Sequence, residues 1–177
     1  MIVLPSLLRD LLDEVDETRA AHLALDFARH VLDIERAEIE EPVLEACLVH
    51  IAAAHEAIDL GEAHPRLFRA HERLLETGMR WEGHRYDAAR GVEPTLQAAR
   101  VGTEQLMSDA KGYGQVSLLP CFSVAREMQA RAGRWYAQRA PDGADERLAA
   151  RRARWEEARW QVLHILATEP GPDDKGR

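Results

Sequence analysis

Eight histidines are the residues of this chain whose type most readily supports metal or acid–base chemistry. Di-iron helical bundles use Glu-x-x-His, in which the carboxylate and the imidazole lie one turn apart on the same helix. No histidine here has a carboxylate three positions before it. The zinc pattern His-Glu-x-x-His is also absent, because His55-Glu56 and His71-Glu72 are not followed by the second histidine. The spacing therefore predicts no metal and no cofactor, and histidines with structural or solvent-facing roles.

Two local pairings would occupy some of these histidines. His55 and Asp59 are four residues apart, as are Asp26 and His30, and side chains with this spacing meet on one helix face. Both pairs are expected to form hydrogen bonds. By contrast, His50 and His55 are five apart and fall on different faces, which makes them poor partners for one ion.

An alternative remains open if side chains converge from different helices. The chain would then be a helical-bundle enzyme, or a small-molecule or metal-binding protein, with a histidine-lined pocket. The histidines available for such convergence are His22, His30, His50, His55, His71 and His84. The pocket itself would be built from His22, His55, His71, His84, Tyr86 or Cys121.

The two cysteines offer little further chemistry. Cys47 falls on an apolar helical stripe and is interpreted as core. Cys121 follows Pro120 at an expected helix start, where a thiolate would be favoured, but packing is the preferred interpretation because no nucleophile signature surrounds it. Phosphate-loop, dinucleotide and serine-hydrolase motifs are all absent.

The elements that must position these residues are all expected to be helices. Apolar residues recur at spacings of three and four along most of the chain, which is typical of amphipathic helices, and Gln115–Leu119 is the sole strand candidate. The pattern predicts an all-α, single-domain bundle of about seven helices over residues 1–168, with no significant sheet and a disordered tail at 169–177. The predicted helices span 2–15, 17–34, 42–60, 65–78, 94–110, 120–139 and 144–167.

Sequence signals also predict particular helix ends and faces. Asp16 or Thr18 is expected to cap the second helix, and Gly61 to end the third in a left-handed conformation. In the last helix Trp155 and Trp160 are five apart, so one of them is expected to be exposed as an interface anchor. Its apolar stripe is expected at Leu148, Trp155, Val162 and Leu166.

Charge is distributed unevenly along the chain. Residues 1–45 contain twelve acidic and four basic residues, so they account for the whole formal net charge of −8. Nucleic-acid binding depends on cations that neutralise phosphates, so direct nucleic-acid binding is disfavoured. The sequence contains no apolar run long enough for a membrane span, no secretory signal and only two cysteines, which together favour a cytoplasmic location.

Three segments resemble a known family. Leu23–Glu35, Gly61-Glu62-Ala63 and Trp160-Gln161 are similar to parts of the Imm-5-like immunity proteins of bacterial polymorphic toxin systems. The likeness covers residues 20–75 and 150–166. It implies a non-enzymatic helical protein that binds and neutralises a cognate toxin, and it transfers no catalytic residue.

An acidic surface would suit such a role, because an inhibitor can occupy a toxin's basic groove with carboxylates. We therefore expect a protein partner, such as a basic toxin domain, to bind around the turn between the second and third helices. Self-association through the long last helix, as in a structural subunit, is a further possibility. The predicted partner-binding residues are Asp33, Glu35, Glu38, Glu40, Glu41 and Glu45.

Overall fold

The computed structural model describes residues 4–82 and 91–168. In this part of the chain there are eight α-helices, one 3-10 helix (η1) and no strand, which confirms the all-α prediction and leaves residues 115–119 without a strand. None of these helices is long and apolar enough to cross a membrane. The elements are α1 (Leu4–Asp13), α2 (Glu17–Glu35), η1 (Arg36–Glu38), α3 (Glu41–Leu60), α4 (Pro65–Glu82), α5 (Val92–Ala99), α6 (Thr103–Ala110), α7 (Cys121–Ala137) and α8 (Glu146–Thr168).

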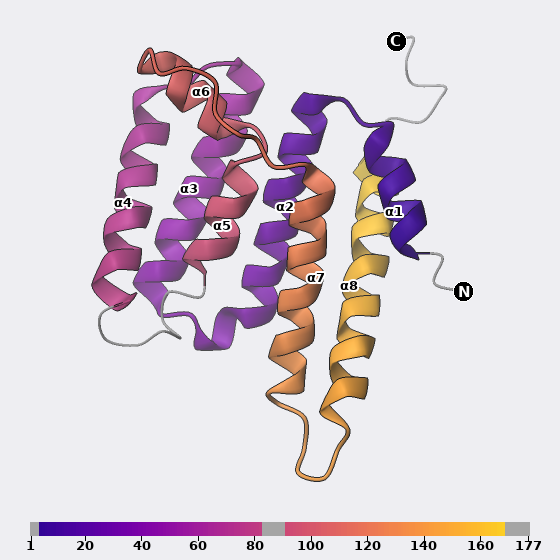
Figure 1. Ribbon diagram of the computed structural model, residues 1–177. Helices are drawn as coiled ribbons and strands as arrows, with labels where there is room; N and C mark the ends of the chain where they lie inside the picture. The colour runs from indigo at the N-terminus through magenta and orange to yellow at the C-terminus, as the bar shows by residue number, and fades with distance from the viewer. Residues whose placement is uncertain (1–3, 83–90, 169–177) are drawn as a thin grey trace.

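The helices pack as two antiparallel pairs with α2 between them (Figure 1). On one side α3 pairs with α4, and on the other α7 and α8 form a long hairpin. The short α5 fills the space between α2, α3 and α7, while α1 returns over the outer side of α8. Side chains such as Phe27, Leu23 and Met128 are fully buried at the centre of this arrangement.

The helix predicted over 94–110 is broken into α5 and α6, so that prediction was wrong. The break lies at Arg100–Gly102, where the chain approaches α2. A Cβ atom on Gly102 would lie 2.7 Å from the Cβ of Ala21, so the contact requires glycine. The turn therefore reflects a long-range approach that helical periodicity does not encode.

The predicted helix ends are confirmed. Asp16 caps α2, since its Oδ1 accepts a hydrogen bond from the Arg19 backbone N–H at 2.9 Å. Gly61 ends α3 with φ of 68°, and its N–H bonds to carbonyls of the last helical turn.

The apolar stripe predicted for α8 is mostly on the wrong side. Val162 is buried, but Leu148, Trp155 and Leu166 are exposed. Toward its start, the buried side of α8 carries Ala153, Glu157 and Ala158, because α7 comes very close there: a Cβ on Gly133 would lie 3.0 Å from the Ala150 carbonyl oxygen. Bulky side chains cannot enter such a narrow gap and are displaced to the outside.

Candidate functional site

Two histidines from adjacent helices face each other between α2 and α3. The Nδ1 atoms of His22 and His55 are 2.7 Å apart, the ring planes differ by 10°, and the ring centroids are 5.0 Å apart. With the two nitrogens this close, the ring centroids would be nearer together if either Nδ1 pointed to one side. The two Nδ1 atoms therefore point directly at each other.

The outer nitrogens of this pair are held by carboxylates. His22 Nε2 lies 3.0 Å from Asp59, and His55 Nε2 lies 3.4 Å from Asp26. An ionised carboxylate only accepts hydrogen bonds, so each Nε2 donates and both inner Nδ1 atoms are left as acceptors. One proton shared between them satisfies both Nδ1 atoms. Burial, together with the charge of His55, lowers the pKa of His22 and opposes a second proton.

Asp26 extends the network from α2 to α8. Its second oxygen lies 2.9 Å from His164 Nε2. Burial acts to raise the pKa of Asp26, but the hydrogen bonds from His55 and His164 outweigh it, and the pKa is lowered. Asp26 therefore stays ionised as the acceptor for both histidines.

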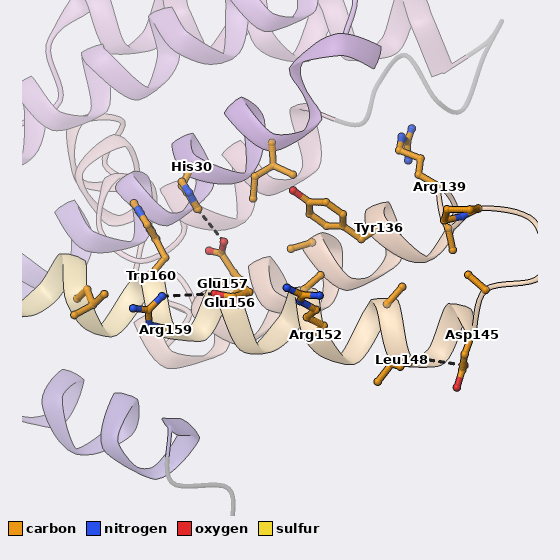
Figure 2. Close-up of a pocket in the computed structure, with 18 residues that line it drawn as sticks. His30, Tyr136, Arg139, Asp145, Leu148, Arg152, Glu156, Glu157, Arg159 and Trp160 are labelled. Atoms are coloured by element: carbon orange, nitrogen blue, oxygen red, sulfur yellow. Dashed lines mark hydrogen bonds and ion pairs between the residues drawn. The ribbon is translucent and has the colours of Figure 1, made fainter.

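Trp160 lies between two histidines. Its ring is stacked on His30, with centroids 3.6 Å apart, and on His164, with centroids 4.8 Å apart. His30 Nδ1 in turn lies 2.8 Å from Glu157, which is buried and accepts a further bond from the Gln161 amide. The histidine network thus connects α2, α3 and α8 (Figure 2 shows its His30, Glu157 and Trp160). The local pairs expected from spacing, His55 with Asp59 and Asp26 with His30, were wrong, since the partners come from other helices.

This network is a chain of side chains rather than a shell around one point. Among the described residues, no group of three or more His, Cys, Asp or Glu side chains could hold a metal ion. The arrangement can hold a proton between two rings and fix the rotamers of its members.

A second histidine pair lies between α3 and α4, with His50 buried and His71 half-buried. His71 Nδ1 lies 3.4 Å from His50 Nε2, and the Nδ1 of His50 has no hydrogen-bond partner. Burial lowers the pKa of His50 to about 4 and also lowers that of His71. Both rings are therefore neutral near pH 7.

The residues of the alternative pocket are only partly brought together. His22 and His55 meet, whereas His71 contacts His50 instead. Burial raises the pKa of the Cys121 thiol to about 12 and that of Cys47 to about 11, so neither is a ready nucleophile. His84 and Tyr86 lie outside the described residues, as does the predicted tail at 169–177.

One predicted partner-binding residue is not on the surface. Glu35 is buried, and its carboxylate lies 3.0 Å from the buried guanidinium of Arg131 on α7. Arg131 also lies 3.2 Å from Glu93. Glu35 therefore stabilises the packing of α2 on α7 and is not available to a partner.

The other five predicted residues are exposed, but arginines already neutralise three of them. Glu40 and Glu41, at the start of α3, have no ion-pair partner in the described structure and remain open to a partner. The three occupied pairs are Asp33 with Arg29 at 3.4 Å, Glu45 with Arg73 at 2.9 Å, and Glu38 with Arg139.

The structure reveals a second acidic surface at the opposite end of α2. Asp10, Asp13, Glu14 and Glu17, which we call the acidic corner, are exposed and have no ion-pair partner among the described residues. The excess of acid in residues 1–45 was the available signal. Spacing alone did not show which of these carboxylates lack a cation.

A groove runs between α8, the end of α7 and the second half of α2. Its volume is about 1070 Å³, and Figure 2 shows the side chains that line it. Exposed Tyr136, Leu148 and Leu163 give it apolar walls, and Arg152 and Arg159 lie along α8 beside them. We call this the α8 groove.

Comparison with protein-family models, curated proteins and solved structures finds no match. The resemblance to immunity proteins therefore stays a prediction.

Proposed function

We propose that this protein is a non-catalytic binding protein that neutralises a basic protein partner, of the toxin kind, through an acidic surface. The observation that carries the proposal is the acidic corner. Its four carboxylates lie within eight residues of chain, at the turn where α1 meets α2, and none has a cation partner in the described structure. Such a cluster attracts a basic surface and speeds the encounter with it.

The acidic corner has a rigid support. Leu8 and Leu12 of α1 are buried in the hydrophobic core, and Asp16 caps the first turn of α2. A partner would therefore meet carboxylates whose backbone is already ordered, which limits the entropy lost on binding. We propose Glu40 and Glu41 as a weaker, second contact, because neighbouring acids there are paired with arginines.

The experiment measures association with the product of the gene that neighbours this one, which the proposal requires to be a basic toxin. Neutralising the acidic corner (Asp10→Asn, Asp13→Asn, Glu14→Gln and Glu17→Gln together) should slow association about tenfold at low salt and flatten its salt dependence. Glu40→Gln with Glu41→Gln is the matched control and should have a smaller effect. Unchanged association in the four-residue variant, or a neighbour that is no toxin, would refute the proposal.

The second candidate function is metal binding by His22 and His55, and it requires the two rings to separate, because their Nδ1 atoms are 2.7 Å apart and leave no room for an ion between them. Both rings donate their other nitrogen to a carboxylate, Asp59 or Asp26, as metal-ligating histidines commonly do. Elemental analysis of the purified protein tests this function. A stoichiometric metal that is lost in His22→Ala would support it, and metal-free protein that binds no added zinc would exclude it.

A further inference from the structure

Helix α8 exposes large apolar side chains along its outer face. They are Leu148, Trp155, Leu163 and Leu166, with exposed fractions of 52%, 49%, 52% and 59%. At 100° per residue these four positions fall within one sector of the helix, and they span about 27 Å along its axis. We call these four residues the apolar stripe; it differs from the stripe expected from the sequence in containing Leu163 and not Val162. Several large exposed apolar side chains on one helix face commonly mark a site of macromolecular contact.

Arginines lie among the side chains of the stripe. Arg151 and Arg152 have no ion-pair partner among the described residues, and Arg159 lies only within 3.8 Å of Glu156. The exposed face of α8 is therefore positively charged, although the whole chain carries a net charge of −8. Its partner should be apolar at the centre and anionic at the margins.

The surface beside the stripe is concave. Leu148 and Leu163 belong both to the apolar stripe and to the α8 groove, whose volume is about 1070 Å³ (Figure 2). A concave wall accepts side chains that protrude from a partner. An amphipathic helix, which presents such side chains every three or four residues, has the matching shape and length.

From these features we infer that the α8 groove and apolar stripe dock an amphipathic helix of another protein, with carboxylates flanking its apolar face. Apolar side chains of that helix enter the groove and cover Trp155, and its carboxylates pair with Arg151, Arg152 and Arg159. This surface is separate from the acidic corner, so the inference does not depend on the proposed toxin partner.

Charge and shape disfavour two other occupants. A second copy packed about a two-fold axis would place the same arginines of both chains in one interface, where like charges repel. A membrane surface is flat and would leave the groove unfilled, and the net charge of −8 opposes approach to anionic lipid.

The experiment is a selection from a displayed library of 18-residue helical peptides, with leucine fixed at helical spacing and the flanking positions random. Retained peptides should be rich in Asp and Glu at the flanks. Their affinity should fall about tenfold or more for Trp155→Ala and for the triple variant Arg151→Glu, Arg152→Glu and Arg159→Glu. The matched controls are Tyr113→Ala and Arg126→Glu, which change an exposed aromatic and an exposed arginine elsewhere and should leave affinity unchanged.

Circular dichroism confirms that each variant keeps its helices. No peptide retained better by the native protein than by the triple variant, or retained peptides that are basic, would overturn the inference. So would a dimer in light scattering that Trp155→Ala dissociates, or flotation with anionic vesicles that the same variant abolishes. The acidic-corner variant should bind the selected peptides normally, which separates failure of this inference from failure of the proposed function.

Discussion

The two ends of α2 handle carboxylates in different ways. Near Glu35, acidic side chains are paired with arginines, as in the buried contact with Arg131. Near Glu17, the exposed carboxylates of the acidic corner have no cation, while Asp26 and Asp59 bind histidines. Most acidic residues at the Glu35 end are thus paired with arginines, whereas those toward the Glu17 end either have no cation or accept hydrogen bonds from histidines.

This difference separates fixed from titratable electrostatics. A guanidinium remains charged at every relevant pH, so the Glu35 end has constant pairing. An imidazole changes charge near pH 6.5, so pairing along the Asp26 and Asp59 side responds to acid. A count of acidic residues in the sequence does not distinguish these cases.

Removing the arginine that pairs with Glu35 should have the largest effect on stability. Arg131→Met leaves the buried carboxylate of Glu35 without its cation, and we expect a loss of about 4 kcal/mol in the free energy of unfolding. Urea denaturation at pH 7 measures it. The double variant Glu35→Leu with Arg131→Met should recover most of the loss, whereas Glu40→Gln should change stability by under about 0.5 kcal/mol. A mild loss in the single variant would mean that the buried pair contributes little.

Acid should act on histidines and leave the arginine pairs unchanged, and His50, buried on α3 away from the Asp26 network, should respond most. The pKa of His50 is about 4 in the folded protein and near 6.5 when unfolded, so the unfolded state binds more protons between these values. Stability should therefore fall as the pH drops from about 6.5 to about 4, by on the order of 3 kcal/mol from this residue. Denaturation across that range should show a flatter pH profile for His50→Leu. An equally steep profile would assign the acid sensitivity to other groups.

The shared proton between His22 and His55 gives a smaller, more specific signal. A double-mutant cycle with His22→Ala and His55→Ala should give a coupling energy of about 1 kcal/mol at pH 7, as expected for a hydrogen bond between two side chains. The coupling should weaken on acidification, because burial and the neighbouring ring lower the pKa of His22 and oppose a second proton in the pair. A coupling that grows on acidification would contradict the shared-proton assignment.

The smallest expected change in stability comes from the cap at the Glu17 end of α2, and it distinguishes a carboxylate with a structural role from an unpaired one. Asp16→Ala removes the cap of α2 and should cost about 1 kcal/mol, whereas Asp16→Asn keeps an acceptor and should be nearly neutral. Asp13→Ala, at an exposed position without a partner, serves as the control for lost charge. Thermal unfolding compares the three, and equal effects at positions 13 and 16 would argue against the cap.

Local features of the fold could be predicted from the sequence. Helix periods, the Asp16 cap and the Gly61 end depend on residues within a few positions of one another. The exposed face of α8 could not, because it is set by how closely α7 approaches at Gly133, a contact between separate helices. The break before α6 has the same kind of cause at Gly102.

The candidate sites required contacts that are distant in the sequence. Glu35 and Arg131 are 96 residues apart, and His30 and Glu157 are 127 apart. The sequence pointed to acidic residues and histidines as the residue types that form the candidate sites. Spacing, however, assigned them partners on the same helix, such as Asp59 for His55. Packing of α2 against α3, α7 and α8 chose other partners, and only that packing shows which acids remain free.

The stacking of Trp160 between His30 and His164 gives the chain a built-in optical reporter. A protonated imidazole quenches an adjacent excited indole, so the emission of this tryptophan should dim as its neighbours acquire charge. Trp155 lies on another side of the same helix and is exposed. Its emission wavelength is expected to shift when a partner covers it and removes it from water. Because the chain has four tryptophans, variants that keep only Trp160 or only Trp155 would follow the charge of the stacked histidines and the occupancy of the outer face separately, with no added dye.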